Sequence, residues 1–190
     1  MPTPTRKRLS AIQRQQLQLR NDLWPSLDES TLWARDKADG WLSVPRAMPL
    51  ILQTMDSMSK GKPISGAYLD LWFRTYDNSF VIVNKEREMA FYAGFSGERG
   101  VRTWVSRIKI LKELSFIDVK EGPNGPVSYI LIRNPYLALQ SHHAKGQIAD
   151  VYMNALKQRM IEIGAKDLTP PSRPRVRAGT KLKSVGAVKP

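Results

Sequence analysis

The chain has 190 residues and a formal net charge of +13, and 42% of its residues are hydrophobic. Its length suits one domain with extensions, or at most two small domains. It contains no cysteine, which excludes disulfides, thiol catalysis and cysteine-based zinc sites. No apolar run approaches the roughly 20 residues of a membrane-spanning helix, and the basic N-terminus lacks the apolar stretch of a secretory signal. We therefore expect a cytoplasmic protein with no membrane contact.

The charge is concentrated at the two ends of the chain. Residues 1–20 carry five basic residues and no acidic one, and residues 169–190 carry six basic residues and no acidic one. Residues 21–168 are nearly balanced, with 19 basic and 17 acidic residues. Basic arms attract phosphate backbones by releasing condensed counterions, without reading sequence. The pattern predicts a nucleic-acid partner, although solubilising or disordered ends would carry the same charge.

The first predicted element is a helix over residues 7–24. Its apolar residues fall near one helical face, and the helix ends at Trp24-Pro25 because the residue before a proline is disfavoured in the α conformation. We assign residues 1–24 to a basic N-terminal helical arm. The arm packs on the rest of the chain or pairs with a second subunit, so the terminal helices are candidates for a homodimer contact.

Residues 45–83 predict two helices and a strand. Pro45 and Pro49 favour a helix start, and an apolar stripe continues this helix through Met58. Ser65 is placed to cap a second helix over residues 66–74. The β-branched run at residues 80–83 predicts a short strand.

Residues 84–114 predict two helices joined by a glycine-containing turn. Asn84 is placed to cap the first helix, over residues 85–93, and residues 94–97 form the turn. The second helix runs from about Glu98 to Leu114. On a helical wheel its core-facing residues are Val101, Trp104, Val105, Ile108 and Leu111.

The opposite arc of this second helix carries the residue types that contact DNA. The candidate DNA-binding residues on it are Arg99, Arg102, Thr103, Ser106, Arg107 and Lys109. The first four belong to the early turns, which helix-turn-helix proteins place against base edges, whereas Arg107 and Lys109 suit phosphate oxygens. Lys112 and Glu113 fit this arrangement least well. The alternative is a solvated basic face on an ordinary packed helix.

A β-hairpin follows the basic helix directly. Strands over residues 116–120 and 127–133 flank a tip at residues 121–126, and Asn124-Gly125 favours a tight turn because both residues accept positive φ. Lys120 and Asn124 are the candidate nucleic-acid contacts of this hairpin. The alternative is a hairpin that only closes the core.

The C-terminal part predicts a helix and then a tail. Asn134-Pro135 suits an N-cap with proline at the first helical position, and the helix extends to about Ile163, or breaks near Gly146. Adjacent histidines at His142-His143 point in different directions on a helix, so we expect no metal site there. We find no P-loop or nucleophile-elbow motif, and we expect neither a cofactor nor enzymatic activity. Residues 169–190 are proline-rich and basic, which predicts disorder.

The order of helix, tight turn, basic helix and hairpin, and the run GVRTWVSRIKILKELSFIDVKEG at Gly100–Gly122, carry a resemblance to a known family. Residues 45–140 resemble the winged helix-turn-helix domains of bacterial regulators and plasmid-type replication initiators. Ser115 departs from the pattern, because glycine is common at this helix end. Initiators of this kind usually carry two winged domains, and only one is found here. The resemblance therefore implies a regulator of transcription or of plasmid or mobile-element maintenance.

We therefore expect an α+β protein, mainly helical with a small β-hairpin. The expected parts are the arm at residues 1–24, a winged helix-turn-helix domain at 25–140, a C-terminal helix at 141–168 and a disordered basic tail at 169–190. The expected function is sequence-specific binding of double-stranded DNA. Two alternatives stay open: a winged-helix protein-interaction module without specific DNA binding, and an RNA-binding protein.

Overall fold

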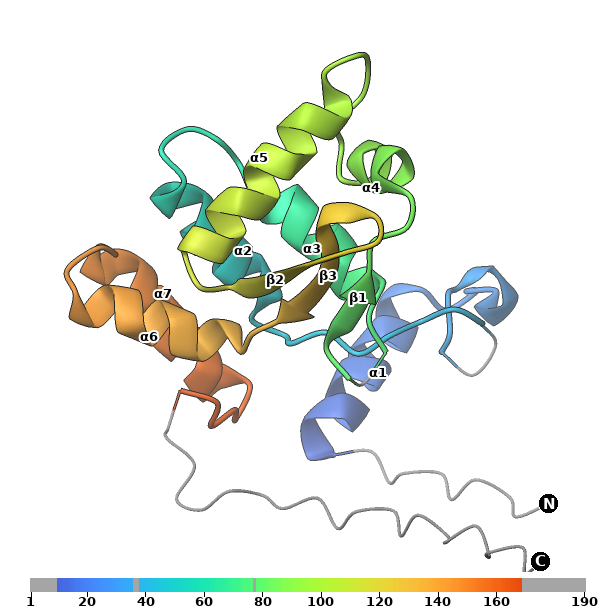
Figure 1. Cartoon of the computed structure of the whole chain (residues 1–190). Helices are drawn as coiled ribbons and strands as arrows, with labels where there is room; N and C mark the ends of the chain where they lie inside the picture. The colour runs from blue at the N-terminus through green and yellow to red at the C-terminus, as the bar shows by residue number, and fades with distance from the viewer. Residues whose placement is uncertain (1–9, 36–37, 77, 169–190) are drawn as a thin grey trace, which may run out of the picture. The chain divides into compact units, whose positions relative to one another are not determined.

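The computed structural model describes residues 10–35, 38–76 and 78–168. Within these ranges the chain forms seven α-helices, one turn of 3-10 helix and a three-stranded antiparallel sheet (Figure 1). This confirms the α+β class expected from the sequence. The chain divides into two units, one ending at Trp41 and the other beginning at Leu42, and each unit is described separately.

The first unit contains helix α1 (Ala11–Leu23) and the 3-10 turn η1 (Glu29–Thr31). Helix α1 begins at a capping box: the backbone N–H of Gln13 donates to the Ser10 hydroxyl, and the backbone N–H of Ser10 donates to the Gln13 side chain. Its C-cap is Trp24, as the Trp24-Pro25 step predicts. No residue of α1 is buried. The expected helix start at residue 7 lies outside the described residues.

The second unit starts with helices α2 (Met48–Met58) and α3 (Ser65–Phe73), and Pro49 lies in the first turn of α2 as predicted. The expected cap of α3 is wrong. Asp56, near the end of α2, accepts the backbone N–H groups of Ile64 and Ser65 at 2.7 and 2.9 Å. The Ser65 hydroxyl donates to the other Asp56 oxygen at 2.6 Å, and Ser65 is the first residue of the helix, not its N-cap. A carboxylate from the preceding helix therefore takes the role expected of a local serine.

The sheet contains β1 (Phe80–Ile82), β2 (Ile117–Gly122) and β3 (Gly125–Ile132) in the order β1-β3-β2. Val81 and Val119 both pair with Ile130 of the central strand, and all three side chains are buried. The intervening residues of each strand point to the other face, because side chains alternate along a strand. The sheet is one strand larger than the predicted hairpin because the predicted strand at residues 80–83 joins it.

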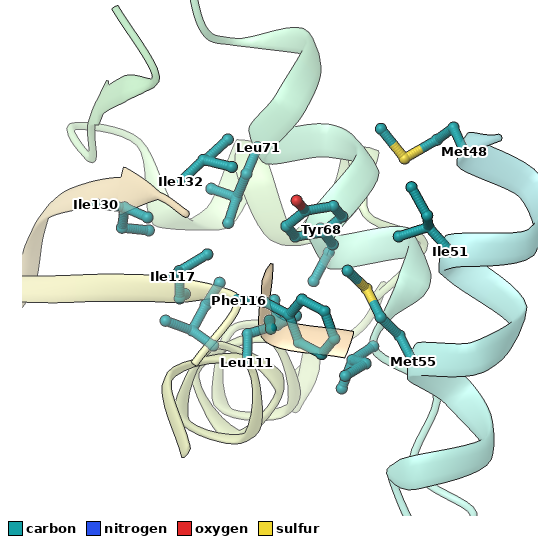
Figure 2. Close-up of a cluster of buried hydrophobic side chains, with 14 of the residues drawn as sticks. Met48, Ile51, Met55, Tyr68, Leu71, Leu111, Phe116, Ile117, Ile130 and Ile132 are labelled. Atoms are coloured by element: carbon teal, nitrogen blue, oxygen red, sulfur yellow. The ribbon is translucent and has the colours of Figure 1, made fainter. Parts of the chain in front are cut away.

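The hydrophobic core lies between the helices and one face of this sheet. Figure 2 shows part of it, formed by Met48, Ile51, Met55, Tyr68, Leu71, Leu111, Phe116, Ile117, Ile130 and Ile132. Burial of a large apolar side chain contributes about 1.5–3 kcal/mol. Leu111 packs in this core among side chains from both helices and strands. This packing holds the helix to which Leu111 belongs in one orientation.

The hairpin turn differs from the sequence prediction. Gly122 pairs with Gly125, so the central residues of the turn are Pro123 and Asn124. Gly125 has φ +106°, but Asn124 is not among the residues with positive φ. The expected Asn-Gly turn is therefore wrong. Proline fixes φ at about −65°, which suits the first central position of common β-turns. Pro123 takes this position, so the turn lies one residue earlier than the predicted Asn-Gly turn.

Two helices follow the sheet: α6 (Pro135–Ala144) and α7 (Asp150–Glu162). The Asn134 side chain accepts the Tyr136 backbone N–H at 3.0 Å, which confirms the predicted cap. The chain breaks between the helices at Gly146, where φ is +68°. The predicted single helix to Ile163 is therefore wrong, and its alternative with a break is confirmed. Residue 140, the expected boundary between the winged domain and the C-terminal helix, lies inside α6. The predicted disordered tail at residues 169–190 lies outside the described residues.

Candidate nucleic-acid interface

Helices α4 (Glu86–Tyr92) and α5 (Gly100–Glu113) lie on either side of the predicted turn at residues 94–97, and Figure 1 shows α4 beside the N-terminal end of α5. The predicted cap at Asn84 is wrong, because the N-cap residue of α4 is Lys85 and its side chain makes no capping hydrogen bond. Glu86 and Glu88 lie in the first turn of α4. Their negative charge stabilises the positive end of the helix dipole, so the helix forms without a side-chain cap.

Close backbone packing determines where α5 begins. A Cβ atom added to Gly100 would lie 2.7 Å from the carbonyl oxygen of Phe95, closer than real Cβ contacts allow. The Phe95 backbone N–H donates to the carbonyl oxygen of Ala90 at 2.8 Å, which ties the turn to α4. Only glycine therefore permits this approach of α5 to the turn. The sequence pattern placed Gly100 inside the second helix but did not predict this steric requirement.

The predicted DNA-contacting residues divide into two groups by exposure. Arg99, Arg102 and Lys109 are exposed, and Thr103, Ser106 and Arg107 are half-buried. Arg102, Ser106 and Lys109 lie at spacings of four and three residues, so they form one stripe along α5. The buried face of α5 carries Trp104, Ile108 and Leu111, which directs this stripe away from the core.

The basic stripe has no acidic partner. Across residues 10–35, 38–76 and 78–168, no ion pair involves a cation of α5. Two cations elsewhere are paired: Arg74 lies 2.8 Å from Asp70, and Arg133 lies 3.1 Å from Asp118. The hydrogen bond from the Val119 backbone N–H, with Arg133 as a smaller contribution, lowers the pKa of Asp118. The positive charges of α5 are therefore available to an external anion, whereas the charge of Arg133 is already neutralised by Asp118.

Arg107 lies at the edge of this surface. The carbon at the centre of its guanidinium group is 5.7 Å from the ring centre of Phe95. Its Nε atom is buried and makes no hydrogen bond to any residue that the structure describes. The structure thus places the Arg107 guanidinium over Phe95, in the turn between α4 and α5. Its predicted phosphate contact stays a prediction.

The C-terminal end of α5 has an unusual residue in a left-handed conformation. Ser115 has φ +61°, and its backbone N–H donates to the Lys112 carbonyl at 2.9 Å. The N–H of Phe116 donates to the Leu111 carbonyl at 3.0 Å. These two bonds form a Schellman motif, in which glycine normally occupies the left-handed position. Serine there is strained, because left-handed conformations cost about 1–2 kcal/mol for residues with a Cβ atom.

His142, in α6, contacts the same end of α5. Its Nε2 atom lies 2.9 Å from the Leu114 carbonyl oxygen, and its Nδ1 atom lies 2.6 Å from the Gln147 side-chain oxygen. His142 is buried, and its ring stacks on Phe116. His143 instead contacts Asp150 near the surface. One of the two adjacent histidines thus caps α5. The carbonyl that it reaches lies 28 residues earlier in the chain, beyond the range of any local sequence pattern.

The two hairpin candidates have different environments. Lys120 is exposed on β2, beside Tyr129 of β3. The Asn124 side-chain amide donates to the Val83 carbonyl at 2.9 Å, which ties the hairpin tip to the residue after β1. Lys120 is therefore available to an external phosphate. One amide N–H of Asn124 therefore has a structural role, and its second N–H and its carbonyl oxygen are left for a ligand.

None of the helices formed by the described residues has both the length and the apolar character needed to cross a membrane. The same residues contain no group of three or more histidine, aspartate and glutamate side chains arranged for a metal ion. Comparisons of the chain with protein-family models, with curated proteins and with solved structures find no match.

Proposed function

We propose that this chain is a winged helix-turn-helix protein that binds double-stranded DNA. The order α3, β1, α4, α5, β2, β3 and the sheet order β1-β3-β2 support this proposal. In this fold α5 is the recognition helix and the β2–β3 hairpin is the wing. The resemblance noted at Gly100–Gly122 covers the recognition helix and the first strand of the wing.

The observation that carries the proposal is the unpaired basic stripe on α5. Arg102 and Lys109 are exposed without an acidic partner among the described residues, opposite the buried Trp104 face. An α-helix with its side chains is about 10–12 Å in diameter and fits into the major groove, which is about 12 Å wide. Arginine can donate two hydrogen bonds to a guanine edge, and lysine suits a phosphate oxygen. Arg102 would read sequence, and Lys109 would position the helix.

The two ends of the chain supply attraction that does not depend on sequence. Residues 1–20 and 169–190 together carry eleven basic residues and no acidic one. Such segments bind the phosphate backbone and release counterions. Base discrimination then depends on α5. The resemblance favours a cytoplasmic regulator of transcription or of plasmid or mobile-element maintenance.

In vitro selection from random DNA duplexes, followed by fluorescence anisotropy, tests the proposal on the full chain. The selected duplex is compared with a scrambled duplex, with its single strands and with RNA of the same sequence. We expect the selected duplex to bind at least about a thousandfold more tightly than the scrambled one, because specific recognition has that scale. A palindromic consensus would also indicate a dimer.

Other outcomes would overturn the proposal. Preferred binding of looped or single-stranded RNA favours the RNA-binding alternative. Absence of duplex binding even at low salt favours the protein-interaction module, because non-specific electrostatic binding is strongest under that condition.

A further inference from the structure

An open cleft lies beside α4 and the first turn of α5. Its volume is about 1070 Å³, and its lining residues fall between Lys85 and Val101. Ala90, Phe95 and Val101 contribute apolar surface, and Phe91 lies at the cleft with 66% of its surface exposed. Ligand sites are clefts of about 300–1,000 Å³ lined mainly by apolar and aromatic side chains, with a few polar groups. The cleft is thus large enough for an organic molecule.

The charges around the cleft favour a cation. Its lining contains three carboxylates, Glu86, Glu88 and Glu98, and two basic residues, Lys85 and Arg87. Lys85 and Glu88 neutralise one another, because their charged atoms are 3.3 Å apart. No ion pair within the described ranges uses the other two carboxylates. The lining thus has two free carboxylates, Glu86 and Glu98, against one free cation, Arg87, while the Arg107 guanidinium lies over the ring of Phe95, another lining residue.

The aromatic side chains select the same class of ligand. The face of a phenyl ring attracts cations through its quadrupole. Arg107 already lies over the Phe95 ring, so Phe91 supplies the accessible ring face. An ammonium or phosphonium group near Glu86 and Glu98 could therefore place an apolar body against Phe91 and Val101.

We propose that this α4–α5 cleft binds a lipophilic organic cation. Glu86 and Glu98 supply the attraction for its charge, and Phe91 supplies the contact for its aromatic body. The proposal does not depend on DNA binding, although the cleft includes Gly100 and Val101 from the first turn of the proposed recognition helix.

Titration of the full chain with tetraphenylphosphonium tests this proposal by calorimetry, and chemical-shift changes in ¹H–¹⁵N NMR spectra locate the site. We expect saturable binding, with the largest shifts between residues 85 and 101. The double variant Glu86→Gln/Glu98→Gln should weaken binding about tenfold, the effect of losing two charge contacts. The matched control Glu113→Gln/Glu121→Gln removes two exposed carboxylates outside the cleft and should leave affinity unchanged.

Two further variants give independent evidence. Phe91→Ala should also weaken binding, and its exposure makes the variant safe for folding. Arg87→Gln should tighten binding about twofold, because it removes a like charge from the site. No saturable binding, shifts outside residues 85–101, or equal losses in the cleft and control double variants would overturn the proposal. Weaker binding of Arg87→Gln would also contradict it.

Discussion

The Nε2 atom of His142 lies 2.9 Å from the carbonyl oxygen of Leu114, the C-cap residue of α5. A carbonyl can only accept a hydrogen bond, so Nε2 is the donor in this contact. The last carbonyls of a helix have no partner within the helix. His142 therefore satisfies one of them from α6 and links the C-terminal helices to the proposed recognition helix.

His142→Ala should reduce the free energy of unfolding by about 1–3 kcal/mol, because it leaves a partly buried carbonyl without its side-chain donor and removes a buried ring packed on Phe116. Urea unfolding followed by circular dichroism measures this change. His143→Ala is the control; it loses only a contact near the surface and should cost less than about 1 kcal/mol. Equal losses in the two variants would contradict a capping role for His142.

Ser115→Gly should stabilise the protein by about 0.5–1 kcal/mol, because glycine relieves the left-handed strain but increases the entropy of the unfolded chain. Gly94→Ala gives the opposite test at the end of α4, where φ is +88°. It should destabilise the protein by about 1 kcal/mol or more. Thermal unfolding of both variants checks the two signs, and a destabilised Ser115→Gly variant would contradict the strain at the end of α5.

Arg102→Ala should weaken binding of the selected duplex by about 1–3 kcal/mol and relax preference at one base position. Its side chain is exposed and makes no ion pair within the described residues, so stability should be unchanged. Lys157→Ala, an exposed residue of α7, is the matched control. Anisotropy titrations measure both, and full affinity in Arg102→Ala would exclude α5 as the reading helix.

Lys109→Ala should weaken binding to selected and scrambled duplexes by a similar factor, because a phosphate contact carries no sequence information. The slope of log affinity against log salt should fall by about 1. Titrations over a range of salt concentrations give this slope. A loss confined to the selected duplex would instead assign Lys109 to base reading.

Removal of residues 169–190 should weaken binding to every duplex and flatten the salt dependence. Each cation that contacts phosphate contributes about 0.9 to the slope, and this segment carries six. A full-length variant with these cations replaced by glutamine separates the effect of charge from that of chain length. An unaltered salt slope in both proteins would show that the segment does not contact DNA.

Local patterns in the sequence predicted most elements of the fold. The apolar spacing of Trp104, Ile108 and Leu111 predicted which face of α5 is buried, and the side chains in these positions are buried. The Asn134-Pro135 signal predicted the start of α6. These predictions succeed because helix periodicity and capping depend on residues only a few positions apart.

The ends of the elements depended on contacts between distant residues. Asp56 caps α3 from another helix, Asn124 reaches the Val83 carbonyl 41 residues earlier, and Arg107 turns toward Phe95. The cleft beside α4 likewise joins side chains that follow no single helical pattern. The sequence by itself determined which segments are helices and strands and which face of α5 is basic. Only the tertiary structure decided how those segments end and which charges stay unpaired, because hydrogen bonds and ion pairs form between groups that folding brings together.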